Sequence, residues 1–208
     1  MDKELFMDPA ISRSKFETEV AEWAKRSADH AKRGILLLAA DYPKAFAAFA
    51  LPIVRPQQLL FGVELDFTNY DIWPPSVEFA DPLTREPFPF GASSLSKVIM
   101  GNVVTDLFIR FRQDTTNGNR LIPENPVLRQ GPGGPAFLCM KGVREYHDHP
   151  AHSGDSWLQY RGSGIGTLFY ILDKLHEFGI AHLNGMHLTF NYTSAGPPQL
   201  EPAPNVEP

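Results

Sequence analysis

One stretch of the chain holds most of the side chains that could do chemistry. It reads Phe137-Leu-Cys139-Met-Lys-Gly-Val-Arg-Glu145-Tyr-His147-Asp-His149-Pro-Ala-His152-Ser-Gly-Asp155-Ser-Trp157, and three of the seven histidines fall within six positions of it. Cys139 is the only cysteine, which excludes an internal disulfide framework and any site built from several thiolates. Its sulfur can therefore pack, ligate one metal ion, or act as a nucleophile.

Metal binding is the first interpretation of this cluster. Glu145, His147 and His149 occupy alternate positions, so in an extended segment all three side chains would point to one side. A Cys139 thiolate could then complete a four-coordinate shell of one sulfur, one oxygen and two nitrogens, a mixture that suits zinc. His152 is a spare ligand or supports one of the others.

A reactive cysteine is the second interpretation. The thiolate is the attacking species, and a neighbouring imidazole or other base raises its share at neutral pH. Cys139 would be the nucleophile, with Glu145, His147, His149 and His152 shaping its acid–base surroundings. A third interpretation leaves the cysteine as a small buried residue and the histidines on a solvated loop.

Two helices are expected to frame the elements that position this stretch. Apolar residues at three- and four-residue spacing predict a first helix over 14–32, opened by a Ser14–Glu17 capping box and closed by Gly34. The same spacing predicts a second helix over 165–178. The Gly162-Ser-Gly-Ile-Gly166 run before it lacks the lysine of a phosphate-binding motif, which favours a flexible loop.

Strand signals fill the region between these helices. Residues 59–67 alternate apolar and other side chains, which predicts a half-buried antiparallel strand. Further strands are predicted at 35–39 or 45–53, at 77–79 and at 103–111, and the apolar segment 136–140 carries Cys139. The order predicts an α+β fold, in which an antiparallel sheet is flanked by an N-terminal helix and a C-terminal helix.

Length and composition limit the organisation and the partners. With 208 residues, 43% of them apolar, we expect a single domain over 14–193, after an N-terminal extension (1–13) and before a proline-rich disordered tail (194–208). A formal net charge of -5 leaves no basic stripe for nucleic acid. No run resembles a signal peptide or a membrane span, so we expect a cytoplasmic protein without a membrane partner.

The order of these motifs resembles ubiquitin-conjugating enzymes. The run from Leu60 to Phe79 is similar to the part of that family where a strand leads into a Tyr-Pro…Pro-Pro turn and then a Val-x-Phe strand. Gly-Pro-Ala-Phe-Leu-Cys139, followed by Trp157 and a helix, is similar to the family's Gly-x-x-Cys segment. The resemblance covers most of residues 14–178. It implies a bacterial ubiquitin-conjugating fold whose Cys139 receives a ubiquitin-like protein from an activating enzyme as a thioester.

The chain departs from this family ahead of the cysteine. The usual His-Pro-Asn, whose asparagine helps to stabilise the oxyanion, is missing, and Asn125-Pro126 lies fourteen positions upstream of Cys139 as a substitute. Asn125 therefore joins Cys139, His147 and His149 as a candidate catalytic residue. Thioester chemistry of this kind needs no cofactor.

A second resemblance is to a bacterial family named for a Cys-Glu-His-His pattern. That family is predicted to bind metal, and it accompanies ubiquitin-like proteins, activating enzymes and JAB-type peptidases. Matched to this chain, the four residues are Cys139, Glu145, His147 and either His149 or His152. The resemblance implies a zinc-binding accessory or hydrolytic protein of the same pathway. An inactive conjugating-like domain that only binds partners is the third function left open.

Overall fold

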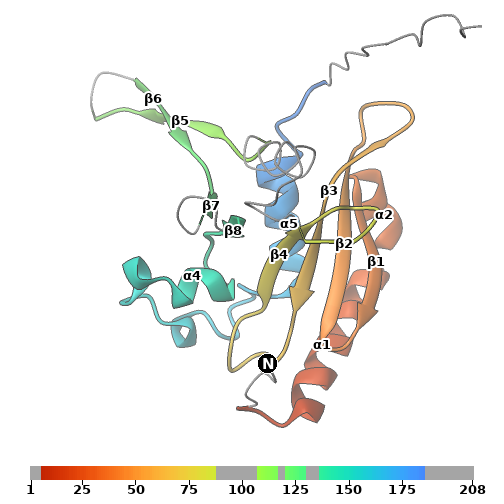
Figure 1. Cartoon of the computed structure of the whole chain (residues 1–208), viewed down its shortest axis with the longest axis vertical. Coiled ribbons are helices and arrows are strands. Elements are labelled where there is room, and N and C mark those ends of the chain that lie inside the picture. Colours follow the sequence, from red (N-terminus) through yellow and green to blue (C-terminus); the bar gives the residue numbers. More distant parts are fainter. Residues whose placement is uncertain (1–5, 88–106, 117–119, 130–135, 186–208) are drawn as a thin grey trace, which may run out of the picture.

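A six-stranded antiparallel sheet organises the structure, a computed structural model that describes residues 6–87, 107–116, 120–129 and 136–185. The strand order is β1-β2-β3-β4-β8-β7, and every neighbouring pair is antiparallel (Figure 1). The strands are β1 (Ile35–Asp41), β2 (Lys44–Leu51), β3 (Gln58–Asp66), β4 (Ser76–Ala80), β7 (Val127–Arg129) and β8 (Ala136–Leu138). β5 (Arg110–Asp114) and β6 (Arg120–Glu124) form a separate two-stranded sheet.

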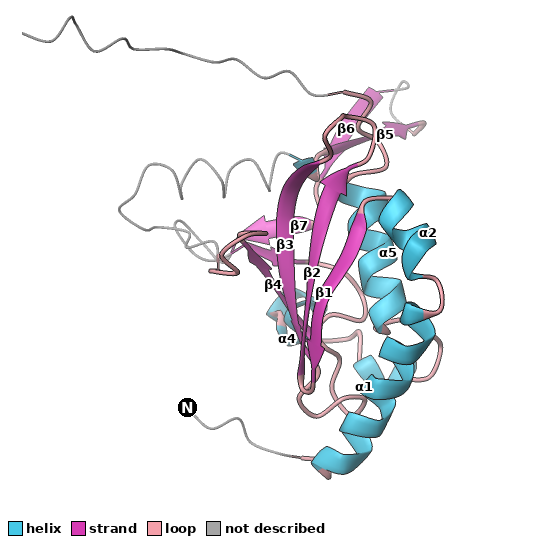
Figure 2. Cartoon of the chain, turned by 90° about the vertical axis from the view of Figure 1, so that its right-hand side faces the viewer, coloured by secondary structure: helices cyan, strands magenta, loops and turns pink. Residues whose placement is uncertain are grey.

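Helices from the two ends of the described chain pack on one face of the sheet. α1 (Pro9–Ala24), α2 (Ser27–Lys32) and α5 (Leu168–Gly179) lie side by side on this face (Figure 2). A short helix, α4 (Arg144–Asp148), and two 3-10 turns, η1 (Pro150–His152) and η2 (Trp157–Gln159), connect β8 to α5. The α+β prediction, with an antiparallel sheet and flanking N- and C-terminal helices, is confirmed.

The core forms where the apolar stripes of the helices meet the sheet. On α5 the fully buried side chains recur every three or four residues, at Leu168, Ile171, Leu172 and Leu175. This spacing places them on one face of a helix. Thr167 begins α5 by accepting a hydrogen bond from the Tyr170 N–H through its hydroxyl, 3.2 Å away.

The predicted single helix over 14–32 is wrong at its start and in its middle. α1 begins at Pro9, where the Asp8 carboxylate accepts a hydrogen bond from the Ala10 N–H (2.9 Å), so the helix starts five residues earlier than predicted. Helix α1 ends at Ala24, and α2 begins only at Ser27. The predicted stop at Gly34 is confirmed by its φ of +84°.

The strand predictions hold in the first half of the chain. Segment 59–67 corresponds to β3, both alternatives at 35–39 and 45–53 are strands, and 77–79 lies within β4. The strand expected at 103–111 begins only at Arg110, and residues 103–106 lie outside the described part, as does the tail at 194–208. Across the described ranges no helix combines the length and apolarity needed to cross a membrane.

Candidate functional site

Cys139 lies where the chain leaves the sheet. β8 pairs with β7 on one side and with β4 on the other, and Cys139 directly follows its last residue, Leu138. The Cys139 N–H donates a hydrogen bond to the Pro126 carbonyl (2.7 Å), which extends the β7–β8 pairing by one contact. The backbone of the cysteine is therefore fixed by two strands, while its side chain is only half-buried.

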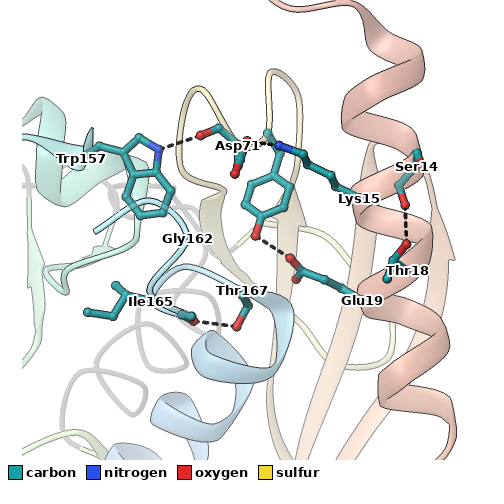
Figure 3. Close-up of a pocket in the computed structure, with 11 residues that line it drawn as sticks. Ser14, Lys15, Thr18, Glu19, Asp71, Trp157, Gly162, Ile165 and Thr167 are labelled. Carbon is teal, nitrogen blue, oxygen red and sulfur yellow. Dashed lines mark hydrogen bonds and ion pairs between the residues drawn. The ribbon is translucent and has the colours of Figure 1, made fainter. Parts of the chain in front are cut away.

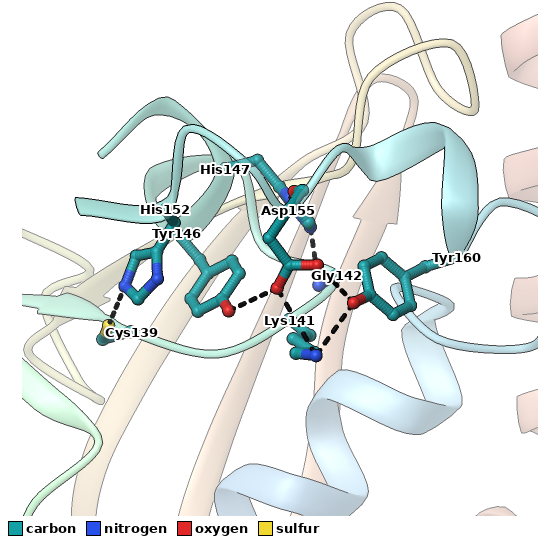
Figure 4. A network of polar contacts seen from close by, with 8 residues as sticks. All are labelled: Cys139, Lys141, Gly142, Tyr146, His147, His152, Asp155 and Tyr160. Carbon is teal, nitrogen blue, oxygen red and sulfur yellow. Dashed lines mark hydrogen bonds and ion pairs between the residues drawn. The ribbon is translucent and has the colours of Figure 1, made fainter. Parts of the chain in front are cut away.

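The thiol of Cys139 faces one histidine. Its Sγ lies 3.4 Å from Nε2 of His152 (Figure 4), within hydrogen-bond distance for sulfur. Burial raises the pKa of the Cys139 thiol above its ordinary value, so the neutral thiol is the favoured form. A thiol of this kind needs a base to become a nucleophile, and the His152 imidazole is in place to accept the proton.

Asn125 is adjacent in sequence to a residue that binds the backbone of Cys139. It precedes Pro126, whose carbonyl holds the Cys139 N–H, and both residues lie in the short link between β6 and β7. The Asn125 side-chain oxygen accepts a hydrogen bond from the Val127 N–H (2.9 Å) and fixes this link. The structure thus brings the sequence-predicted Asn125 and Cys139 into one neighbourhood.

The prediction that Glu145, His147 and His149 lie on an extended segment is wrong. Residues 144–148 form the helix α4, and His149 follows as its C-cap. Successive positions of a helix rotate by about 100°, so residues two apart point to nearly opposite sides. Alternate spacing therefore turns His147 away from Glu145, and His149 lies beyond the helix in extended backbone.

Glu145 points away from Cys139 and toward the sheet. Its carboxylate accepts hydrogen bonds from the Ser76 hydroxyl and from the Val77 N–H (3.2 Å), both at the start of β4. Burial raises the pKa of Glu145 above its ordinary value, against the opposing effect of these hydrogen bonds. The residue attaches α4 to the sheet.

Backbone groups occupy both ring nitrogens of His147. Nε2 accepts a hydrogen bond from the Gly142 N–H (3.2 Å), and Nδ1 lies 2.8 Å from the Asp155 carbonyl oxygen. Because a carbonyl can only accept, these contacts assign the Nδ1–H tautomer. His149 has its own structural partner, since its Nδ1 accepts a hydrogen bond from the Ala151 N–H (3.2 Å).

The five candidate metal ligands therefore do not converge. Cys139 contacts His152, and the His149 ring lies 5.7 Å from that of His152, while Glu145 and the ring nitrogens of His147 face other partners. The described residues contain no group of three or more histidine, cysteine or acidic side chains that could hold a metal ion. In this arrangement the residues do not fit the four-ligand zinc shell, and zinc binding stays a prediction.

A polar network next to Cys139 was missed by sequence reasoning. The Asp155 carboxylate accepts hydrogen bonds from the hydroxyls of Tyr146 (2.6 Å) and Tyr160, and Lys141 lies 3.4 Å from it (Figure 4). The ring of Tyr146 stacks on His152 with a centroid distance of 3.9 Å. The sequence feature that could have indicated this network is Tyr146, which stands between the candidate residues Glu145 and His147.

The glycine-rich loop before α5 lines a pocket together with Trp157. The pocket has a volume of about 390 Å³, and its polar wall includes Lys15, Glu19 and Asp71 (Figure 3). Glu19 accepts a hydrogen bond from the Leu168 N–H (2.6 Å), so a carboxylate of the chain itself already occupies the first turn of α5. This arrangement argues against phosphate binding there.

Comparisons with known proteins agree on one family. A family model described as Y4jH-like (Y4jH family) matches residues 7–183. The chain is also 36% identical over 203 residues to a protein of Sinorhizobium fredii (strain NBRC 101917 / NGR234) named "Uncharacterized protein y4jH". The alignment covers 94% of this chain and 97% of that relative. The similarity therefore extends over the sheet, the helices and the cysteine site.

Proposed function

The chain belongs to the Y4jH family, and from the geometry of its site we propose that Cys139 is a nucleophile that carries a ubiquitin-like protein as a thioester. The single observation that carries this proposal is the 3.4 Å contact between Cys139 Sγ and His152 Nε2. It pairs a half-buried thiol of raised pKa with a base. The partners would be a ubiquitin-like protein and its activating enzyme, with a JAB-type peptidase acting in the same pathway.

The fold supports the same proposal. The meander β1-β2-β3-β4 follows α1, and the cysteine and α5 come after it, an order compatible with a ubiquitin-conjugating fold. Asn125-Pro126 lies beside the cysteine through the Pro126–Cys139 hydrogen bond, although fourteen positions separate Asn125 from it in sequence. The Asn125 side-chain NH₂ is the group that would donate to an oxyanion formed at Cys139.

The proposed reaction is an exchange of thioesters. As the Cys139 sulfur attacks the thioester carbonyl on the activating enzyme, its proton passes to His152 Nε2. The tetrahedral intermediate then collapses, the bond from carbonyl carbon to the enzyme's sulfur breaks, and that leaving thiolate takes up a proton. In a second step an amine attacks the new thioester, forms an amide and releases the Cys139 thiol.

The test uses the chain's single cysteine as an unambiguous reporter. The protein is incubated with ATP and with the activating enzyme and ubiquitin-like protein of the same bacterium. We expect an adduct that is cleaved by dithiothreitol, absent in Cys139→Ala and replaced by a thiol-resistant ester in Cys139→Ser. Exchange of the exposed His182 for glutamine is the matched control and leaves the adduct unchanged.

Two other outcomes would overturn the proposal. Absence of any adduct with active partners, in a folded protein, would contradict the thioester function and favour a domain that only binds partners. One zinc ion per chain in purified protein, lost in both Cys139→Ala and His152→Ala, would instead assign the sulfur to metal binding. A zinc-held thiolate reacts poorly as a nucleophile, so alkylation of Cys139 would then require a chelator.

A further inference from the structure

His152 is held between the thiol and an aromatic ring. Its Nε2 lies 3.4 Å from Cys139 Sγ, and its ring lies on that of Tyr146 with centroids 3.9 Å apart and an interplanar angle of 20°. The half-buried His152 follows Pro150 and Ala151 in η1. The stack restricts the rotation of an imidazole that a short, irregular segment would otherwise leave free.

Tyr146 is itself fixed. The residue is buried in α4, and its hydroxyl donates a hydrogen bond to the Asp155 carboxylate (2.6 Å). Burial, together with this carboxylate, raises the pKa of Tyr146 to about 12, so the hydroxyl stays a donor at neutral pH. The Asp155 N–H also donates to the His152 carbonyl (2.9 Å), which ties the backbone of the histidine to the same residue.

Asp155 remains ionised as the anchor of this arrangement. Hydrogen bonds from Tyr146 and Tyr160 lower the pKa of Asp155 to about 2, and Lys141 adds a favourable charge. Tyr160 binds the same carboxylate but does not stack on His152, as its ring lies near His147 instead, at 5.9 Å. The two tyrosines therefore share an anchor and differ in whether they contact the base.

We infer that Tyr146 is a positioning residue, which, held by Asp155, fixes the His152 ring in the orientation that lets Nε2 take the proton of Cys139. This inference deepens the proposed function, since it rests on Cys139 acting as a nucleophile. Tyr146 touches neither the sulfur nor an incoming thioester. Its contribution is the geometry of the base, and small errors in such geometry lower rates strongly.

The experiment measures alkylation of Cys139 by iodoacetamide as a function of pH, without any partner protein. Mass spectrometry follows one addition per chain because there is one thiol. In the wild type we expect the alkylation rate of Cys139 to rise already near neutral pH, below the pH range in which an isolated thiol titrates. Loss of the base in His152→Ala should remove this early rise and lower the rate at pH 7 by about tenfold or more.

The variants at the two tyrosines separate positioning from general stability. Tyr146→Leu removes the stack and should reproduce most of the His152→Ala loss, whereas Tyr146→Phe keeps the ring, loses the Asp155 hydrogen bond and should show a partial loss. Tyr160→Phe removes the other Asp155 hydrogen bond and should keep the wild-type pH profile. Circular dichroism verifies that each variant is folded, and Tyr146→Phe decides the case if Tyr146→Leu does not fold.

Two results would overturn the inference. One is a wild-type pH profile in a folded Tyr146→Leu or Tyr146→Phe protein, and the other is an equal loss in Tyr160→Phe. The outcomes remain distinct from those of the proposed function. A wild-type alkylation profile that depends on Tyr146, together with no adduct from the activating enzyme, would support the positioning role and reject the carrier function.

Discussion

His30 gives the sharpest stability prediction. Its side chain in α2 is 4% exposed, and neither ring nitrogen has a hydrogen-bond partner within the described residues. The ring stacks on Trp23 with a centroid distance of 3.6 Å and an angle of 11°, and Phe169 meets it edge-on. His30→Phe would keep the aromatic stack and remove both unsatisfied nitrogens.

The magnitude follows from these contacts. A buried polar group without a partner destabilises a fold by about 1–3 kcal/mol, and the slightly larger phenyl ring offsets part of the gain. We therefore expect His30→Phe to raise the free energy of unfolding by about 1–2 kcal/mol at pH 7.5. In a chain of this length, the corresponding rise in melting temperature is about 2–8 °C.

The pH dependence sharpens this expectation. Burial, followed by the charges of Arg33 and Arg26, lowers the pKa of His30 from its ordinary value of 6.5, and Asp29 and Asp173 oppose this effect. Below pH 6.5 the unfolded chain takes up a proton that the folded chain resists, so stability falls as the pH falls. The gap between variant and wild type should widen by up to about 1.4 kcal/mol from pH 7.5 to 5.5.

Urea unfolding at these two pH values tests both parts of the prediction. Gln57→Ala, an exchange at an exposed residue that does not titrate, is the control and should follow the wild type at each pH. A variant His30→Phe that is no more stable at pH 7.5, and whose advantage does not grow at pH 5.5, would refute the reasoning. That result would mean that the imidazole is satisfied in the folded protein.

Two further predictions concern the segments around the site. Gly142→Ala should destabilise by at least about 1–2 kcal/mol because φ is +86° and a Cβ would lie 2.5 Å from the Gly166 nitrogen. In urea unfolding, Gly162→Ala is its control, with φ +79° and open space, and equal losses would contradict close packing. In the wild type, burial raises the folded pKa of Glu145, so the protein should lose stability as the pH rises above 4.5. Glu145→Gln should remove this loss. Parallel curves between pH 4 and 7 would contradict this.

Local patterns predicted the strands in the first half of the chain and helix α5 because the apolar residues there form a simple pattern, whereas β6 and β7 were not predicted. In β3 the large buried side chains Phe61, Val63 and Leu65 stand at every second position, and the apolar stripe of α5 has a helical repeat. The start of α1 was missed although Asp8-Pro9 is a standard helix opening. The amphipathic stripe begins later in the chain, and the prediction therefore placed the start of the helix at Ser14.

The sequence identified Cys139 and His152 as candidate residues but did not predict that they pair with each other. The two-residue spacing of Glu145, His147 and His149 does not distinguish a strand from a short helix over so few residues, so the sequence could not decide how α4 directs Glu145 and His147. His152 was considered as a spare ligand and as one of four residues around the thiol, yet it is the histidine that meets Cys139. That contact depends on the turn at Pro150 and on the stack with Tyr146, which local patterns do not report.

One carboxylate has a consequence for the order of events during synthesis. Glu19, near the start of the described chain, binds the Leu168 N–H at the beginning of the last helix, 149 positions later. Contacts of such long sequence separation form late, since the intervening chain must be closed into a loop first. Residues 19 and 168 must both have been synthesised before this contact can form, so the first turn of α5 receives its carboxylate only after the sheet and the thiol region between them have been made.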